Sequence, residues 1–358
     1  MPFTLKTNEP EARERLRAFW RGESVGGRPA LIVEADNPTF VDKPWRGPTL
    51  DTKGLDLLPE WHAWCADQHL RRTLFLAEAM PGVTPCWGSH LVTVSTLVGA
   101  DYEYHGGSAW IRPIPDVYER PLPVFDPEHP VARSIEHVWR RTAEVVGSRG
   151  FVNGPVFMDP YTTLSQFRTP QQLCLDVVER PEDVFRWGEA LSEFYVAAHN
   201  HFYRLVKSLG YGDSTTWLQV MAEGRMEAVQ CDFAVMLSPE MYGRFVMPDL
   251  RRVTQYLDFS LYHLDGTCQR RFLDLLGTLP KLNGIQWNPE PPAGSPVQWL
   301  DALKDIRRRG WSLYVWASVD DAVVLASELG PDGLCLALPR FRGEKEAGEA
   351  IKAVHRAG

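Results

Sequence analysis

A histidine and an aspartate stand two residues apart in segment 261–266, which reads Leu-Tyr-His-Leu-Asp-Gly. Side chains two positions apart on a strand point to the same face, so His263 and Asp265 would enter one pocket. Gly266 permits a sharp backbone turn, which places the pair where a strand ends. An imidazole and a carboxylate there could bind a metal ion or exchange a proton with a substrate. Local hydrogen bonds that satisfy both groups are the alternative.

The elements that must position this pair are predicted from apolar runs of strand length. Segment 30–35 reads Ala-Leu-Ile-Val-Glu-Ala, a near-continuous apolar run that is typical of a strand covered on both faces. Similar runs recur along the rest of the chain. The predicted strands are residues 30–35, 151–157, 215–220, 228–236, 258–265, 283–287, 311–316 and 333–338.

Helical patterns separate most of these strands. Asn8 is the expected N-cap of a first helix that ends near Gly22, and Ser238 and Ser318 are expected caps of later helices. Further helices are predicted at about 60–79, 131–146, 180–209, 295–309 and 344–356. Strands that alternate with helices long enough for crossovers predict a (β/α)8 TIM barrel formed by residues 1–358 as a single domain. Residues 1–28 would form an N-terminal helix, and residues 37–150 a long excursion over the barrel mouth.

In such barrels the active site lies at the carboxyl ends of the strands. This rule collects acidic, aromatic and amide side chains around one histidine, a set that suits a flat or partly cationic organic ligand. For each tryptophan, packing in the core is the alternative. The expected site residues are Glu34, Asp36, Asp159, Tyr161, Gln219, Asp232, His263, Asp265, Trp287, Asn288, Trp316 and Ser318.

Composition narrows the class of protein. The chain has 358 residues, is 44% hydrophobic and carries 13 tryptophans, which indicates a compact globular protein. A net charge of -8 argues against a nucleic-acid partner, because phosphate binding depends on clustered lysine and arginine. The N-terminus lacks the pattern of a signal peptide, and no apolar run reaches about eighteen residues. We therefore expect a cytoplasmic protein with a small-molecule substrate and no membrane contact. The six cysteines are scattered and are expected to be free thiols.

Segments 232–241, 245–250 and 263–266 together resemble the uroporphyrinogen decarboxylase superfamily. They read Asp-Phe-Ala-Val-Met-Leu-Ser-Pro-Glu-Met, Phe-Val-Met-Pro-Asp-Leu and His-Leu-Asp-Gly. The superfamily also contains zinc-dependent methylcobamide:coenzyme M methyltransferases and the methyltransferases of corrinoid-dependent demethylation systems. The resemblance extends from about residue 28 to the C-terminus and implies the same barrel fold.

Departures from the family pattern favour the methyltransferase branch. Decarboxylases carry arginines after the first strand that hold substrate carboxylates, whereas segment 33–38 here reads Val-Glu-Ala-Asp-Asn-Pro. The position that aligns with the aspartate of the decarboxylases, which holds the pyrrole nitrogens, falls near His90. An acidic pocket would repel a tetrapyrrole that bears many carboxylates. Uroporphyrinogen is therefore a poor substrate for this chain.

The methyltransferase branch has a histidine, any residue, a cysteine and a glycine where this chain has His263 to Gly266. In that branch these residues, with a cysteine near the last strand, bind a zinc ion that activates a substrate thiol. The resemblance implies His263, Asp265 and Cys335 as zinc ligands, with Asp232 in a supporting or ligating role. The alternative for Cys335 is that it is a small apolar residue buried in the core. Cys268, three residues beyond Asp265, is another thiol that could reach the site instead.

Three hypotheses for function follow. The first is a methyltransferase that moves a methyl group between a corrinoid, free or on a small corrinoid-binding partner protein, and a small acceptor. The second is a metal-independent decarboxylase or another acid-base enzyme that uses Asp232, His263 and Asp265. The third is a ligand-binding barrel without catalysis.

Overall fold

The computed structural model describes residues 2–85, 93–290 and 292–358. It has a mixed α/β architecture built on a seven-stranded, mostly parallel sheet, and the strand order is β2-β1-β11-β10-β9-β8-β7. The strands are β1 (Ala30–Asp36), β2 (Thr73–Ala77), β7 (Met226–Val229), β8 (Phe259–Asp265), β9 (Gly284–Asn288), β10 (Ser312–Trp316) and β11 (Leu334–Ala337).

The parallel strands are the apolar runs of the sequence. Most residues of β1, β10 and β11 are buried, which is typical of strands covered on both faces. Neighbouring strands are held in a register that aligns His263 of β8 with Gln286 of β9, Tyr314 of β10 and Cys335 of β11. Because aligned residues point to the same face, this row runs along the face that carries His263.

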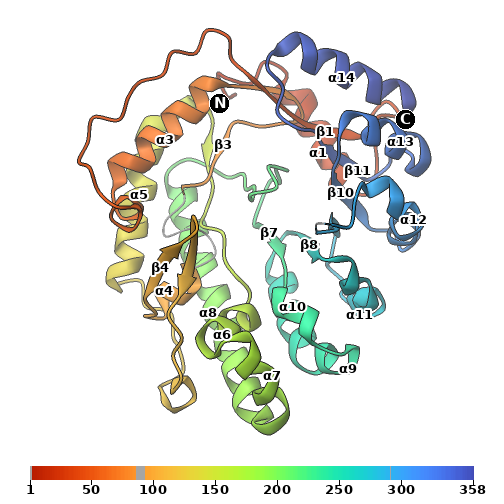
Figure 1. Cartoon of the computed structure of the whole chain (residues 1–358). Helices are drawn as coiled ribbons and strands as arrows, with labels where there is room; N and C mark the ends of the chain where they lie inside the picture. The colour runs from red at the N-terminus through yellow and green to blue at the C-terminus, as the bar shows by residue number, and fades with distance from the viewer. Residues whose placement is uncertain (1, 86–92, 291) are drawn as a thin grey trace.

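Helices connect the parallel strands. Figure 1 shows α10 to α14 following one another around one side of the molecule, with the strands on their inner side. The helices of at least eight residues are α1 (Glu9–Trp20), α3 (Pro59–Arg72), α5 (Pro130–Val146), α6 (Pro160–Arg168), α7 (Pro170–Glu179), α8 (Pro181–Ser208), α10 (Met247–Tyr256), α12 (Leu300–Arg308), α13 (Val319–Leu329) and α14 (Glu344–Ala357). The shorter ones are α2 (Thr52–Asp56), α4 (Thr93–Leu97), α9 (Pro239–Met241) and α11 (Leu273–Leu276).

Serine caps begin two of these helices as the sequence predicted. The Ser238 hydroxyl accepts a hydrogen bond from the Met241 amide, and the Ser318 hydroxyl accepts one from the Asp321 amide. Asn8 precedes α1 as expected, but its side chain does not cap the helix. Its amide donates instead to the carbonyl of Ala77, which joins α1 to the end of β2.

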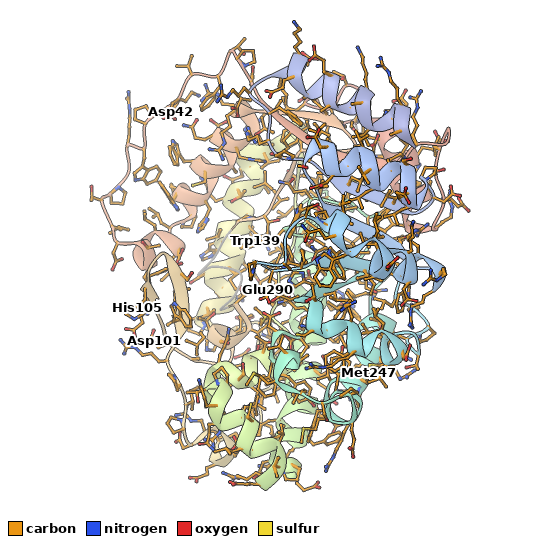
Figure 2. The ribbon with its side chains drawn as sticks, turned by 45° about the vertical axis from the view of Figure 1, so that its right-hand side comes forward. Asp42, Asp101, His105, Trp139, Met247 and Glu290 are labelled. Carbon is orange, nitrogen blue, oxygen red and sulfur yellow. The ribbon has the colours of Figure 1, made fainter. Side chains whose placement is uncertain are left out.

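Two further pairs of strands lie outside the main sheet. The short strands β3 (Gly82–Val83) and β6 (Phe151–Val152) pair in parallel, and β4 (Tyr102–His105) and β5 (Ser108–Ile111) form an antiparallel hairpin. Strands β2 to β5 and helices α2 to α5 all belong to segment 37–150. In Figure 2, Asp42, Asp101 and His105 mark the outer edge of this segment.

The structure corrects four of the predicted elements. The helix expected at 60–79 ends at Arg72, and the apolar residues that follow form β2, which pairs antiparallel with β1. The strands expected at 151–157 and 228–236 are shorter than predicted. Segment 215–220 is not a strand, because the chain folds back there so that Ser214 and Ala222 bridge each other. Gln219 within it has a φ of 61°, which is incompatible with an extended strand.

Within the described ranges, none of the helices combines the length and the apolar character needed to cross a membrane.

Candidate metal centre

Three predicted site residues meet at the carboxyl ends of β7 and β8. His263 and Asp265 share one face of β8, and the distance from His263 Nε2 to Asp265 Oδ1 is 3.6 Å. Asp232 begins a short 3₁₀ helix, Asp232–Met236, soon after β7 ends. One nitrogen of His263 and one oxygen of each aspartate all lie within 4.8 Å of one another. The convergence of His263 and Asp265 that the sequence predicted is therefore confirmed.

The imidazole of His263 is oriented by Gln286, its neighbour on β9. The Gln286 side-chain nitrogen donates to the carbonyl of Trp287 at 3.0 Å, which turns the amide oxygen toward His263 Nδ1. Because that oxygen can only accept, Nδ1 carries the proton and the Nε2 lone pair points at Asp265. Burial lowers the pKa of His263, which favours the neutral form that binds metals.

The carboxylate of Asp265 is held where the chain turns. Asn288, aligned with it on β9, donates a hydrogen bond of 2.5 Å to Asp265 Oδ1. Gly266 follows with a φ of 84°, and a Cβ at that position would lie 2.9 Å from Glu290 Oε2. The positive φ therefore favours a glycine at this position, and its nearest neighbour is the end of the flexible Glu290 side chain.

Asp232 is fixed through its backbone, and its carboxylate remains available. Its amide donates to the Thr162 hydroxyl of α6 at 2.9 Å, whereas its Oδ1 is buried and has no hydrogen-bond partner. Burial is the largest cause that raises the pKa of Asp232 to about 8, and Asp159 and Asp265 add to it. Such a carboxyl group is neutral at pH 7 unless a cation stabilises its charge.

The surroundings of the three residues are acidic. Asp159 caps α6 by accepting hydrogen bonds from the Tyr161 and Thr162 amides at 3.0 and 2.9 Å, and burial raises its pKa to about 6. Glu290, which Figure 2 labels, also raises the pKa of Asp232. Among the described residues, no lysine or arginine forms an ion pair with Asp232 or Asp265. A bound cation would compensate this excess of negative charge.

Asp232 and His263 border a cavity of about 200 Å³, which we call the metal cavity. The Trp217 ring meets the His263 ring edge to face, with centroids 4.8 Å apart, and it lies 5.5 Å from the Trp316 ring. The two indoles make one side of the metal cavity apolar, which limits the access of water to His263. The other lining residues are Val156, Phe157, Met158, Gln230 and Asn288.

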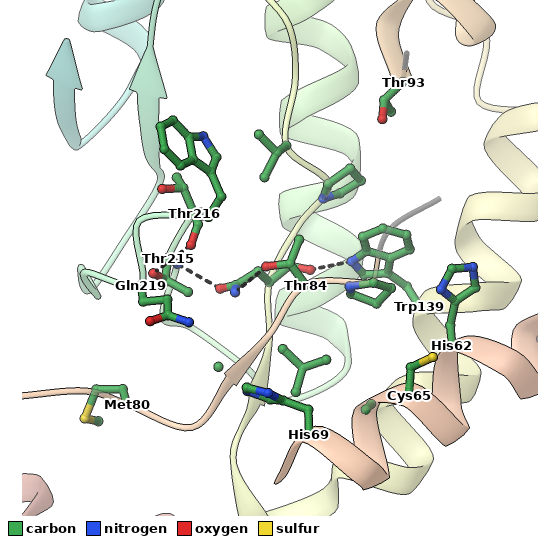
Figure 3. Close-up of a pocket in the computed structure, with 18 of the residues that line it drawn as sticks. His62, Cys65, His69, Met80, Thr84, Thr93, Trp139, Thr215, Thr216 and Gln219 are labelled. Carbon is green, nitrogen blue, oxygen red and sulfur yellow. Dashed lines mark hydrogen bonds between the residues drawn. The ribbon is translucent and has the colours of Figure 1, made fainter. Parts of the chain in front are cut away.

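A second cavity, of about 480 Å³, adjoins the metal cavity and shares Val156 and Trp217 with it. Figure 3 shows it between α3, α5 and segment 213–222, and we call it the α3 cavity. Gln219 lines the α3 cavity, as expected of a ligand-binding residue, but it does not reach the metal cavity.

Several other predicted site residues have different roles. Glu34 and Asp36 both pair with Arg340, at 2.8 and 2.7 Å, and line neither cavity. Tyr161 is buried against Gly188 of α8, so it supports α6 and does not line a pocket. Trp287 is 1% exposed and packs against Trp299, because it points to the opposite face of β9 from Gln286. Trp316 lines the metal cavity, whereas His90 lies outside the described residues.

Cys335 is not part of the candidate metal centre. It lies in the same row of the sheet as His263, but β9 and β10 stand between their strands. It is fully buried, and its pKa is raised strongly by that burial, which opposes the thiolate form that binds zinc. The third residue of the group that could hold a metal ion is Asp232, where the sequence assigned Cys335.

Sequence reasoning missed Trp217, Gln286 and Thr162. Trp217 lies in a segment interpreted as a strand, and it reaches His263 only because that segment folds back. A signal for Gln286 existed, since it is a polar residue inside the apolar run of β9. Nothing local marks Thr162 as the acceptor for the Asp232 amide.

Neither the family models nor the curated proteins contain a match to this chain.

Proposed function

We propose that this protein is an enzyme of the uroporphyrinogen decarboxylase superfamily, of the methyltransferase type. It would move a methyl group between a corrinoid, free or carried by a small partner protein, and a small acceptor. The observation that carries the proposal is the convergence of Asp232, His263 and Asp265, whose ligand atoms lie within 4.8 Å of one another.

The donor set fits a divalent cation, with zinc as the leading candidate. A neutral imidazole nitrogen and two carboxylate oxygens are ligands that zinc accepts in catalytic sites. The buried, unpartnered Oδ1 of Asp232 supports this fit, because an isolated buried carboxylate is costly unless it is paired or coordinates a metal. Gln286 behind His263 and Asn288 beside Asp265 supply the outer hydrogen bonds that metal ligands need.

When bound, zinc would lower the pKa of an acceptor thiol or hydroxyl and so favour its nucleophilic anion. The chain itself would supply the rest of the site. Trp217 and Trp316 would exclude water from one side of the metal cavity.

The same proposal includes the (β/α)8 barrel. In the main sheet the six parallel strands lie in the order β1, β11, β10, β9, β8, β7, the order that neighbouring strands of such a barrel follow. Strands β3 and β6, which also pair in parallel, would be the second and third strands, between β1 and β7 in the chain. Strand β2 would be an antiparallel addition to this plan.

Metal analysis tests the centre directly. The full chain, purified without chelator from zinc-supplemented cells, should hold close to one zinc ion per molecule by elemental mass spectrometry. His263→Ala and Asp232→Asn should each lose most of the metal. Cys335→Ser is the matched control and should retain it, because Cys335 is not near the three ligands. A metal-free wild type, or metal loss only in Cys335→Ser, contradicts the proposal.

A metal-independent acid-base enzyme is the second candidate, and the raised pKa of Asp232 favours it. A carboxyl group with a pKa of about 8 beside a second carboxylate and a neutral imidazole could donate or accept a proton near neutral pH. Under this hypothesis the activity would survive prolonged chelation and follow a bell-shaped pH profile. Under the leading proposal, chelation would abolish the activity and added zinc would restore it.

A further inference from the structure

The α3 cavity has the size and composition of a ligand site. Its volume of about 480 Å³ falls within the range of roughly 300–1,000 Å³ that is typical of small-molecule pockets. Trp61, Trp139 and Trp217 line it, and they present indole rings that suit a planar molecule. None of the predicted catalytic residues lines it.

One wall of the α3 cavity is held in place by Asn153. The Asn153 side chain donates to the Thr84 hydroxyl at 2.9 Å and accepts from the Thr215 amide at 2.8 Å, and its carbonyl accepts from the Trp139 indole (Figure 3). Three segments that are distant in sequence are thus fixed around one buried residue. The cavity is therefore already formed before any ligand binds.

The charges that line the α3 cavity leave one cation without a partner. Burial lowers the pKa of His69 to about 4 and also lowers that of His62, so both rings are neutral at pH 7. The Asp56 carboxylate accepts hydrogen bonds from the Tyr102 and Tyr104 hydroxyls at 3.1 and 2.7 Å. Arg72 is therefore the permanently charged residue of the cavity lining that could bind a charged ligand.

Arg72 lines the α3 cavity and is exposed. Among the described residues it forms no ion pair. The carboxylate of Glu34 interacts with Arg72 electrostatically, but it is already paired with Arg340 at 2.8 Å. A guanidinium recognises a carboxylate through two parallel hydrogen bonds. The unpaired guanidinium of Arg72 therefore favours an anionic ligand in the α3 cavity.

We propose that the α3 cavity binds a planar organic anion, an aromatic or heteroaromatic carboxylate, with the carboxylate on Arg72 and the ring among Trp61, Trp139 and Trp217. Because Trp217 also borders the metal cavity, the end of the ring opposite the carboxylate would face the metal centre. That this ligand is the methyl donor or acceptor rests on the proposed function. The binding of the ligand in the α3 cavity does not.

Calorimetry with 2-naphthoate and its neutral amide, 2-naphthamide, tests the proposal on the full-length protein. Wild type should bind 2-naphthoate, and Arg72→Gln should weaken that binding by about tenfold or more, the effect of losing a charge-assisted pair. The same change should leave 2-naphthamide binding unaltered. Arg71→Gln is the matched control, because Arg71 donates to Gln68 and Val41 and does not line the α3 cavity.

Asp232→Asn separates this inference from the metal centre. It should lose metal and keep its affinity for 2-naphthoate, because Asp232 lines the metal cavity and not the α3 cavity. The inference is overturned if wild type does not bind millimolar 2-naphthoate, if the amide binds as well as the carboxylate, or if Arg71→Gln weakens binding as much as Arg72→Gln. A metal-free wild type that binds 2-naphthoate through Arg72 would overturn the proposed function alone.

Discussion

At the scale of residues, the candidate centre depends on partners that fix each ligand atom. His263 could bind a metal through either nitrogen, but Gln286 occupies Nδ1 and leaves Nε2 for the cavity. The Gln286 amide is itself oriented by the Trp287 carbonyl, so one backbone group on β9 determines which nitrogen of a β8 histidine is available. Positioning residues of this kind touch no substrate, yet they decide what the ligands can do.

Replacement of Gln286 by leucine should therefore weaken metal binding. The leucine removes the acceptor for the Nδ1 proton, so the ring loses its fixed orientation, and we expect zinc affinity to fall about 10–100-fold. Competition with a fluorescent zinc chelator measures this change. Gln230→Leu serves as control, because Gln230 lines the metal cavity but contacts Met158 and none of the three ligands. Equal affinities for wild type and Gln286→Leu would contradict the role assigned to Gln286.

At the scale of elements, β7 carries a buried acidic residue, Glu227, on the face that points away from the candidate site. Ala228 aligns with Leu261, which shares a face with His263, so Glu227 points to the opposite side, toward the helices. Glu227 is 2% exposed, and burial raises its pKa from 4.5 to about 8, although the Ala228 amide donates to it. The carboxyl group is therefore protonated at neutral pH in the folded chain.

This burial gives the stability of the protein a defined pH dependence. The unfolded chain loses the Glu227 proton above pH 4.5, whereas the folded chain keeps it until about pH 8, so stability falls as the pH rises between these values. Glu227→Gln cannot ionise and should be more stable than wild type near pH 8, by up to a few kcal/mol, with little difference at about pH 4.5. Urea unfolding at both pH values measures this. A stability difference that is the same at both would contradict it.

Helix caps also act at the scale of single elements. The Ser318 hydroxyl accepts a hydrogen bond from the Asp321 amide at the start of α13. This helix follows the end of β10 that carries Trp316. Ser318→Ala should cost about 1 kcal/mol of unfolding free energy, because it leaves one amide of the first turn without its partner. Ser134→Ala provides a comparison, since the Ser134 hydroxyl donates to a helix carbonyl within α5 and caps no terminus. Equal effects of the two changes would exclude a capping role.

At the scale of the whole molecule, segment 37–150 and segment 213–222 meet the rest of the chain at Asn153. Its side chain joins the residue after β3 to Thr215, and its carbonyl holds Trp139 of α5. These contacts join residues that are more than sixty positions apart. The walls of the α3 cavity therefore depend on one buried side chain that follows β6.

Asn153→Ala should destabilise the protein by roughly 1–3 kcal/mol, because the buried Thr215 amide loses its acceptor. The loss should appear as a lower midpoint of urea unfolding, and 2-naphthoate binding should weaken with it as the cavity wall loosens. The control is Asn200→Ala on α8, where, among the described residues, the asparagine side chain forms no hydrogen bond. An unchanged midpoint for Asn153→Ala would show that the three segments are held together without it.

The sequence by itself determined the features that depend on neighbours along the chain. The apolar runs of β1 and β8 to β11 predicted buried strands, and the two-residue spacing of His263 and Asp265 placed both on one face, because side chains alternate strictly along a strand. The boundary of α3 and the short β2 were harder to predict, since an apolar run after a helix can continue the helix or pair with a distant strand.

Only the tertiary structure decided which residues complete the site. Cys335 shares a row with His263, but three strand spacings of about 4.8 Å each separate them, and no local pattern reports that distance. Asp232 reaches the centre because the chain leaves β7 early and turns at a 3₁₀ helix, and Trp217 reaches it because segment 213–222 folds back. Contacts of this kind are set by the packing of whole elements, which the spacing of residues along one chain does not encode.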